Sequence, residues 1–436
     1  MLRRPIALGI FLGGALLSAC SSSQTNQSSL PSMGREPSAH SLGVPGISAS
    51  GHSHKVCGDV GFGFARCYAL ERDDLAPTHL SSDSKPGRKP GPTPTPAPTP
   101  TPGGGGGGCS PVSGINGYQP CDLRSAYNLP SATAGSGMIV AIVDAYDDPN
   151  AESDVNNYRS TFGIPACTTS NGCFRKVNQT GGTAYPTGNA SWGQEISLDL
   201  DMVSAICPNC HILLVEGSSA SSSDLATAVD EAAALGANAI SNSYGSAENN
   251  AYDSHYNNHS GIAITASSGD SGYGTQSPAS AINVTAVGGT NLQHAANARG
   301  WSETAWTSAG SGCSTVNAKQ TWQSSINACG SFRGEADVAA VADPNTGVAV
   351  YDSYGSPRNT GWLVFGGTSV ASPVIGSVYA LAGAGVSNAS KAYANTGFLF
   401  DVTSGSNGSC GTNVCNAATG WDGPTGLGTP NGIGAF

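Results

Sequence analysis

From residue 109 onward, short apolar runs alternate with longer amphipathic segments, and this order is the strongest constraint on the fold. The first clear run, at 137–144, reads Gly-Met-Ile-Val-Ala-Ile-Val-Asp and is continuously apolar before its final acid. Such a run is typical of a parallel strand that is buried on both faces. Further strands are predicted at 212–216, 239–241, 261–265, 282–287, 347–351 and 362–365. Together with a helix from Asp224 that stops at Gly236 and another that starts near Ser369, they predict one α/β domain over 109–436. Its central sheet should be mostly parallel and flanked by helices.

The N-terminus indicates export. Residues 1–19 join a cationic start to an apolar run that is too short to span a bilayer, which is the pattern of a signal peptide. The run ends in Leu-Ser-Ala-Cys20, which resembles a bacterial lipoprotein cleavage box and predicts lipid attachment at Cys20. The alternative is an ordinary secretory signal cut near Ala19. Both readings predict an exported protein, either lipid-anchored in the bacterial cell envelope or extracellular after release.

The next part of the chain reads as a tether. Residues 20–82 are mostly polar and are predicted to be largely disordered, apart from a small loop bounded by Cys57 and Cys67. This loop is either a remnant pro-segment strand or merely a disulfide-closed loop in the tail. Residues 83–108 form a proline-rich and then glycine-rich linker, stiff at first and flexible at its end.

The cysteines agree with export. Of 13 cysteines, all but Cys20 can pair, as expected in an oxidising compartment. Their close spacing predicts six short-range bridges: Cys57–Cys67, Cys109–Cys121, Cys167–Cys173, Cys207–Cys210, Cys313–Cys329 and Cys410–Cys415. Cys207-Pro-Asn-Cys210 could instead be half of a zinc site or a redox pair, but no second Cys/His pair has matching spacing.

The low content of charged residues argues against nucleic acid as a partner and favours tolerance of acidic surroundings. Charged residues make up 11% of the chain and the net charge is −11, so no basic patch indicates nucleic-acid binding. A chain with few lysines and arginines gains little self-repulsion when its carboxylates become protonated. Tolerance of acid is therefore expected.

Three short motifs carry the chemistry. Trp-Gly-Gln-Glu195-Ile-Ser-Leu-Asp199 places two carboxyls four residues apart, on one face of a helix. Gly-Gly-Thr-Ser369 lies on a predicted strand-to-helix turn, and Ser-Gly-Asp270-Ser-Gly supplies a third acid. A serine hydroxyl needs a positioned base to become a nucleophile, so both helical acids could serve Ser369.

This set resembles the sedolisin family, acid-acting serine peptidases with a Ser-Glu-Asp triad on a subtilisin-like fold. The resemblance covers roughly 117–436 and implies that Ser369 attacks, Glu195 accepts its proton and Asp199 orients Glu195. It also implies that Asp270, once protonated, donates a hydrogen bond to the oxyanion. Activity should then be greatest at acid pH and fade toward neutrality.

Subtilisin itself is the nearest rival, because it shares the serine motif and a strand that ends in an acid such as Asp144. It would need a histidine in a His-Gly-Thr context at the start of a helix. None of the eight histidines has that context, and Trp-Gly-Gln-Glu195 stands in the expected place. Asp144 could still lie behind the acid pair in a proton network or be a structural strand-end acid.

The resemblance extends to two binding sites. Ile-Ser-Asn-Ser243-Tyr244-Gly245 resembles the edge strand that pairs with extended polypeptide substrates. The C-terminal part resembles the family's site for one Ca2+ ion, with carboxylates or carbonyls from Asp401, Val402, Ala418, Gly420 and Asp422. Ala418 stands where glycine is usual, and the alternative is a glycine-rich loop with incidental acids.

The sequence therefore predicts an exported serine endopeptidase that acts on polypeptides at acid pH. We expect a monomer that meets the membrane only through its lipid anchor. The alternative is a catalytically inactive surface binding protein on a peptidase scaffold. Family members usually carry a large folded pro-domain, and residues 21–108 are too short for one, so self-cleavage within residues 83–108 is a further hypothesis.

Overall fold

The computed structural model describes residues 52–78, 111–355, 360–383 and 385–436. The predicted signal peptide, Cys20 and the linker at 83–108 lie outside these residues. Of the helices in the described ranges, none is long and apolar enough to cross a membrane.

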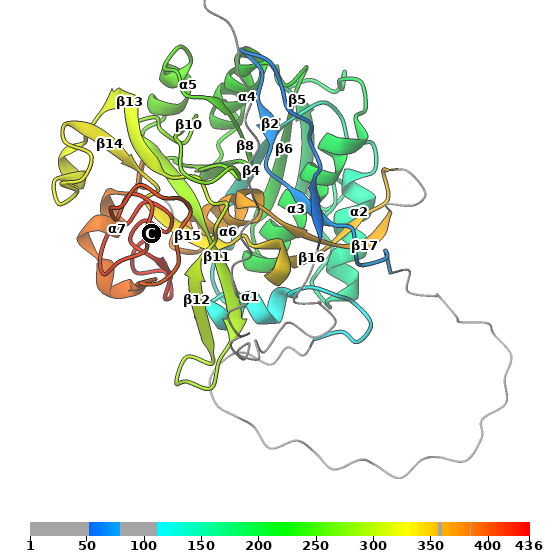
Figure 1. Cartoon of the computed structure of the whole chain (residues 1–436). Helices are drawn as coiled ribbons and strands as arrows, with labels where there is room; N and C mark the ends of the chain where they lie inside the picture. Colours follow the sequence, from blue (N-terminus) through cyan, green and yellow to red (C-terminus); the bar gives the residue numbers. More distant parts are fainter. Residues whose placement is uncertain (1–51, 79–110, 356–359, 384) are drawn as a thin grey trace, which may run out of the picture. The chain divides into compact units, whose positions relative to one another are not determined.

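An eight-stranded sheet forms the centre of the molecule (Figure 1). Its main path runs β12-β11-β9-β7-β4-β6-β5, and β15 pairs with β11. Every pairing is parallel except that of β11 with β12. The strands are β4 (Ile139–Ala145), β5 (Phe174–Asn178), β6 (His211–Gly217), β7 (Ala239–Asn242), β9 (Ala263–Ser267), β11 (Val284–His294), β12 (Trp301–Ala305) and β15 (Val338–Val341). The predicted mostly parallel sheet flanked by helices is confirmed.

Two helices pack against each other on this sheet and carry three of the four predicted catalytic residues. They are α3 (Ala190–Ile206) and α6 (Thr368–Leu381), and α6 also contacts β7, β9, β11 and β15. Nearly every residue of α3 is buried, because α2 (Ala151–Thr161), α6 and β16 (Val348–Asp352) pack against it. The other helices are α1 (Pro120–Ala126), α4 (Ser222–Ala234), α5 (Asp253–Asn257) and α7 (Ser390–Ala394). Helix α4 ends just before Gly236, which has a φ of +87°, as the sequence predicts.

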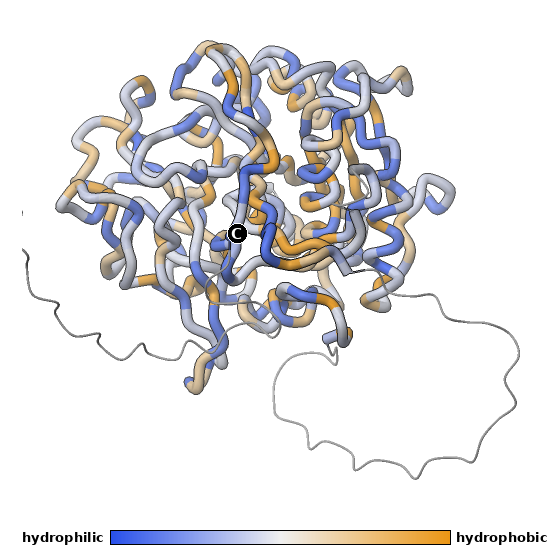
Figure 2. The backbone as a smooth tube through the Cα atoms, turned by 45° about the vertical axis from the view of Figure 1, so that its right-hand side comes forward, coloured by the Kyte–Doolittle hydropathy of each residue, from blue (hydrophilic) through white to orange (hydrophobic). Residues whose placement is uncertain are grey.

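The strands predicted near 347–351 and 362–365 belong to another sheet. They are β16 (Val348–Asp352) and β17 (Gly361–Gly366), an antiparallel pair in a four-stranded sheet of order β1-β3-β17-β16. Their apolar runs resemble those of the parallel strands because both sets are buried, so the sequence does not distinguish them. Figure 2 shows how apolar stretches along the tube alternate with hydrophilic ones.

Residues 52–78 differ from the expected disorder. They form β1 (Ser53–Lys55), β2 (Arg66–Cys67) and β3 (Leu70–Arg72), which pair with strands of the domain that starts near residue 111. Strand β2 joins a three-stranded sheet, β10-β8-β2, with β8 (Tyr244–Ala247) and β10 (Gln276–Ser277). A segment that lies between polar, low-complexity stretches can still become ordered when another part of the fold supplies strand partners.

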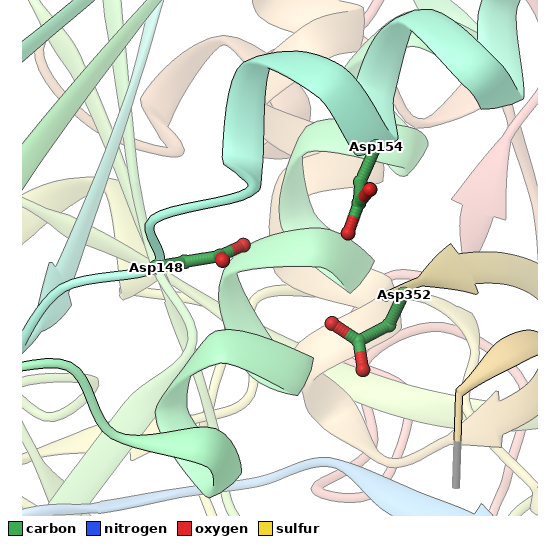
Figure 3. A group of neighbouring side chains, drawn as sticks. All are labelled: Asp148, Asp154 and Asp352. Carbon is green, nitrogen blue, oxygen red and sulfur yellow. The ribbon is translucent and has the colours of Figure 1, made fainter. Parts of the chain in front are cut away.

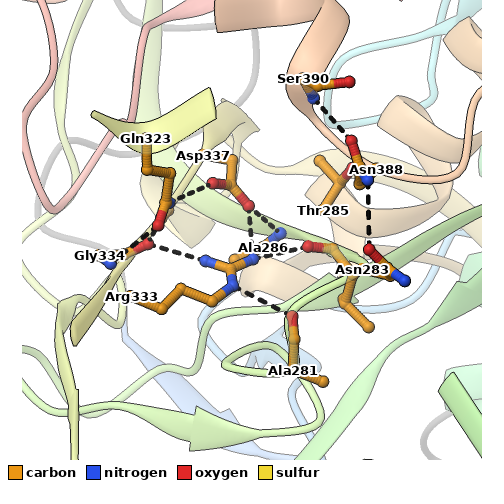
Figure 4. A network of polar contacts seen from close by, with 12 residues as sticks. Ala281, Asn283, Thr285, Ala286, Gln323, Arg333, Gly334, Asp337, Asn388 and Ser390 are labelled. Atoms are coloured by element: carbon orange, nitrogen blue, oxygen red, sulfur yellow. Dashed lines mark hydrogen bonds and ion pairs between the residues drawn. The ribbon is translucent and has the colours of Figure 1, made fainter. Parts of the chain in front are cut away.

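A buried cation holds the segment that joins β14 (Phe332–Glu335) to β15. The Arg333 guanidinium donates to Asp337 at 2.7 Å and to the carbonyl oxygens of Ala281 and Val284 at 3.0 and 2.6 Å (Figure 4). Gln323 donates to the other carboxylate oxygen of Asp337 at 3.0 Å. A buried ion pair whose remaining donors and acceptors are satisfied in this way costs little and pins local geometry.

The remaining strands form two two-stranded sheets: β13 (Gly312–Ala318) pairs with β14, and β18 (Leu399–Phe400) pairs with β19 (Thr429–Pro430). Five of the six predicted disulfides are present: Cys57–Cys67, Cys167–Cys173, Cys207–Cys210, Cys313–Cys329 and Cys410–Cys415. The sixth involves Cys109, which lies outside the described residues. The Cys207–Cys210 bond removes the half-zinc-site alternative.

Candidate active site

Helix α3 brings Glu195 and Asp199 to one side of the catalytic region. The Asn189 side chain caps the helix by accepting a hydrogen bond from the Trp192 N–H at 3.1 Å. Both acids have no exposed surface, because they face the buried junction with α6. The spacing of four residues therefore places both carboxyls on one face of α3, as the sequence predicts.

Ser369 is the second residue of α6, directly after the turn from β17. Its hydroxyl donates to the Ser243 carbonyl oxygen at 3.0 Å and accepts from the Tyr68 N–H at 3.0 Å. Glu195 lies close enough for the Ser369 hydroxyl to oppose the rise in the pKa of that carboxyl, and its Oε1 has no hydrogen-bond partner among the described residues. The turn needs glycine at 367, where φ is +99° and a Cβ would lie 1.8 Å from the Tyr68 carbonyl oxygen.

The two helical acids and Asp144 form one buried group. Burial, and then the neighbouring Asp199, raises the pKa of Glu195 well above its ordinary range. Burial also raises the pKa of Asp199, although the Ser243 hydroxyl donates to both of its carboxylate oxygens at 2.8 Å. Asp144, at the end of β4, has no hydrogen-bond partner for either carboxylate oxygen among the described residues, and its pKa is raised by burial and by both acids. Acids this close titrate as a set that retains protons.

Asp270 follows β9 and contacts the turn that leads into Ser369. Its Oδ1 accepts from the Thr368 N–H and hydroxyl, each at 2.8 Å, while the buried Oδ2 has no partner among the described residues. Burial raises the pKa of Asp270 to about 7. Below that pH a proton resides on this carboxyl, and since Oδ1 is occupied as an acceptor, Oδ2 is the oxygen free to carry it.

The candidate substrate strand is only partly as predicted. Tyr244 and Gly245 lie in β8, but Ser243 stands between β7 and β8, and its hydroxyl belongs to the acid network through Asp199. Strand β8 already has partners on both sides, β10 and β2.

Sequence reasoning missed four residues of this site. Thr368 holds Asp270, Gln276 accepts from the Tyr68 hydroxyl at 2.9 Å, and Tyr68 and Ala69 contact Ser369 and Glu195 through their backbone N–H groups. Thr368 adjoins the serine in the motif and could have been found there. The others come from segments without a local signal.

The predicted calcium loop brings its acids together. Asp422 is buried, and its carboxylate accepts from the Ala418 and Thr425 N–H groups at 3.0 and 2.9 Å. Burial raises the pKa of Asp422 to about 7, and the charge of Asp401 adds to the effect. Asp401 in turn accepts from the Gly420 N–H at 2.9 Å.

A second acidic group was not predicted. Asp148, Asp154 and Asp352 each have a carboxylate oxygen within 4.8 Å of the others (Figure 3). Hydrogen bonds from the backbone and serines hold them: Asp148 accepts from Asn150, and Asp154 accepts from the Ser353 N–H at 2.7 Å. Burial raises the pKa of Asp148 to about 8 and that of Asp352 to about 7, so this group is neutral in acid.

Comparison with known proteins identifies the fold. The sequence model of the subtilase family matches residues 178–395, half of the chain. The chain belongs to the subtilase family.

Within the subtilases this chain is similar to sedolisins. It is 28% identical to kumamolisin of Bacillus sp. (strain MN-32) over 361 residues, 72% of this chain and 62% of kumamolisin. It is 33% identical to sedolisin of Pseudomonas sp. (strain 101) over 176 residues, 36% of this chain and 29% of sedolisin. The chain thus spans less than two thirds of these relatives, and the resemblance to the sedolisin family is confirmed.

Among solved structures, Pseudomonas sedolisin, a serine-carboxyl proteinase complexed with two molecules of pseudo-iodotyrostatin, has the same fold. The TM-score is 0.63 at 24% identity, and the match covers 73% of this subtilase and 96% of that chain. The subtilisin-like α/β architecture is therefore established.

Proposed function

We propose that this subtilase is a serine endopeptidase that cleaves polypeptides in acid through Ser369, Glu195, Asp199 and Asp270. The observation that carries the proposal is the position of Ser369 between two protonatable carboxyls. Glu195 lies near the Ser369 hydroxyl, which opposes the rise in the pKa of Glu195, and the unpartnered Oδ2 of Asp270 lies 2.7 Å from the point where a Cβ on Gly367, two residues before the serine, would be.

The reaction follows from this arrangement. Ser369 Oγ attacks the carbonyl carbon of a peptide bond, and its proton passes to Glu195. Protonated Asp270 donates a hydrogen bond to the oxyanion through Oδ2. Glu195 then gives the proton to the amide nitrogen, the C–N bond breaks, and a water assisted by Glu195 hydrolyses the ester on Ser369. Asp199, which the Ser243 hydroxyl holds, shares the protons of the buried acid set with Glu195 and orients it.

This mechanism sets opposite requirements on two acids. Glu195 must be able to accept a proton, whereas Asp270 must hold one, and the pKa of Asp270 is about 7. Activity should fall as the pH rises through that value, because an ionised Asp270 repels the oxyanion. Preparing Ser369→Ala and Glu195→Gln and assaying unfolded protein over about pH 3 to 6 tests the proposal. Both should lose at least ~10³-fold in kcat, while Glu231→Gln on α4 should match wild type.

The alternative is a binding protein on an inactive scaffold. It would need no reactive serine, so an equal signal from wild type and Ser369→Ala would favour it. The proposed substrate contacts are the backbone groups of Ser243, Tyr244 and Gly245, because the Ser243 carbonyl oxygen accepts from Ser369 and the adjoining β8 pairs with the extended strand β2, whose place a substrate would take.

We also propose one Ca2+ at the C-terminal loop, with oxygens from Asp401, Val402, Ala418, Gly420 and Asp422. Two carboxylates and backbone carbonyls form the hard oxygen set that Ca2+ prefers. The only non-glycine residues with positive φ in the described ranges are Asn128 and Tyr146, so alanine at 418 is unstrained. The ion would reduce the electrostatic repulsion between Asp401 and the buried Asp422.

Export and lipid attachment at Cys20 complete the proposal. The five disulfides within the described ranges support folding in an oxidising compartment. We propose a monomer that is tethered by residues 83–108. Labelling with a radioactive fatty acid, compared between wild type and Cys20→Ser, tests the anchor.

A further inference from the structure

Residues 52–78 pass directly over Ser369 in the manner of a bound polypeptide. Before the serine, β2 pairs antiparallel with β8, with Arg66 opposite Gly245 and Cys67 opposite Tyr244 (Figure 1). After it, β3 pairs antiparallel with β17, the strand that leads into the catalytic helix. The segment therefore uses the strand edges that an extended substrate would need.

The peptide bond between Tyr68 and Ala69 occupies the reacting position. The Ala69 N–H donates to Glu195 Oε2 at 3.0 Å, so the nitrogen that would leave faces the acid that would protonate it. The Tyr68 carbonyl oxygen lies 1.8 Å from the point where a Cβ on Gly367 would be, and Asp270 Oδ2 lies 2.7 Å from the same point. The carbonyl oxygen of this bond thus lies near Asp270 and its nitrogen near Glu195, as the proposed reaction requires.

The Tyr68 side chain fills a pocket beside the serine. It is 2% exposed, and its hydroxyl donates to Gln276 Oε1 at 2.9 Å. A Cβ on Gly245 would lie 2.5 Å from that hydroxyl, so the pocket needs glycine there to admit a phenol. Burial raises the pKa of Tyr68, which keeps the hydroxyl a donor. Both the shape of the pocket and the acceptor oxygen of Gln276 fit an aromatic residue with a hydroxyl group.

Several contacts hold the chain on both sides of the Tyr68–Ala69 bond without involving the bond itself, and together they form a frame around it. On the N-terminal side, the Cys57–Cys67 disulfide ties the segment to the residues that follow β1. Strand β1 pairs antiparallel with β3, beyond the bond, and the Val56 N–H donates to the Ala69 carbonyl oxygen at 3.0 Å. An ion pair of Asp59 with Arg66 closes the loop further. If the bond were cut, these contacts would keep the new ends side by side.

We propose that residues 52–78 are a built-in inhibitor that binds as a substrate does, with Tyr68 in the pocket that selects residues before the cut. This inference rests on the proposed function and deepens it, since it assigns substrates with tyrosine or a similar aromatic residue at that position. Attack by Ser369 forms an ester with the Tyr68 carbonyl carbon, breaks the C–N bond and moves a proton from Glu195 to the Ala69 nitrogen. Because the frame keeps that amine in place, it re-forms the peptide bond and expels Ser369 faster than water enters. The proposed cut lies between Tyr68 and Ala69, and self-cleavage within residues 83–108, outside the described residues, stays a separate prediction from the sequence.

The test compares full-length variants on a chromogenic peptide with tyrosine before the scissile bond, at about pH 4. Cys57→Ser/Cys67→Ser opens the frame, and Tyr68→Ala empties the pocket. Both should be at least ten-fold more active than wild type. Tyr68→Phe, which keeps the ring, should stay within a few-fold of wild type, and Phe62→Ala, at an exposed position of the same loop, should equal it.

Intact mass and N-terminal sequencing give a second readout. In wild type we expect an uncut chain, or a chain cut at Tyr68–Ala69 whose two parts co-elute under native conditions. In the double cysteine variant the part before Ala69 should be lost.

The outcomes separate the two hypotheses. A wild type as active as Tyr68→Ala, or a cut elsewhere that accompanies activation, overturns the inhibitor and leaves the peptidase standing. If Tyr68→Ala and the double variant both show no Ser369-dependent hydrolysis, the proposed function fails and the inhibitor with it.

Discussion

Asp352→Asn tests how the buried acids tie the stability of this fold to pH. The pKa of Asp352 is about 7 in the folded protein, whereas an aspartate in an unfolded chain has a pKa near ~3.9. The folded state therefore binds a proton more tightly. The contribution of the protonated Asp352 carboxyl to the free energy of unfolding is fully present below about pH 4 and is lost as the pH rises through 7. Three pKa units correspond to about 4 kcal/mol, which is an upper figure because local relaxation and entering water reduce it.

Asparagine keeps the shape and stays neutral at every pH. Its side-chain oxygen can still accept from the Tyr354 N–H and the Ser197 hydroxyl, which lie 3.2 and 3.4 Å from Asp352 Oδ1. At pH 4 the variant should therefore match the parent protein. At pH 8 it should be more stable, by up to about 4 kcal/mol and on the order of 10 °C in Tm.

The assay is thermal unfolding at both pH values in chelator, with Ser369→Ala as the parent so that self-digestion does not distort the melting curve. Glu231→Gln, a partly exposed change on α4, serves as the control and should behave alike at both pH values. An equal change in Tm at pH 4 and pH 8, or a loss at pH 8, would refute the proton argument. If added Ca2+ raises the Tm of the parent and not of Asp352→Asn, the group of Asp148, Asp154 and Asp352 holds a cation instead.

The other predictions concern the catalytic and calcium sites. Asp270→Asn keeps a neutral donor beside Thr368, so it should retain most activity while the alkaline decline near pH 7 disappears from the pH profile. Asp270→Ala should lose about 10²–10³-fold in kcat at every pH, and equal profiles for the two variants would contradict the oxyanion role. Chelator should lower the Tm of wild type at pH 6 to 7 and leave that of Asp422→Asn unchanged, whereas an equal response of both would argue against the ion. The chelator effect should shrink in acid, because protons compete for Asp422, whose pKa is about 7.

The sequence alone was enough for the fold class and for the placement of Glu195 and Asp199 on one side of a helix. Continuous apolar runs predict buried parallel strands, and the i, i+4 spacing of Glu195 and Asp199 places both on one side of α3. The close spacing of the cysteines likewise predicts local bridges such as Cys57–Cys67. These features are local, so the physics of a few neighbouring residues decides them.

Only the tertiary structure decided what faces Ser369 and which protons the site holds. Tyr68 lies 301 residues from the serine whose hydroxyl it contacts, and no periodicity in a polar tail predicts that pairing. The raised pKa of Asp270 likewise depends on burial, which the composition of its turn does not reveal. Strand pairing and desolvation are properties of surfaces brought together by folding. For that reason the sequence predicts mostly disorder for residues 52–78, whereas in the fold they pair with strands next to the candidate active site.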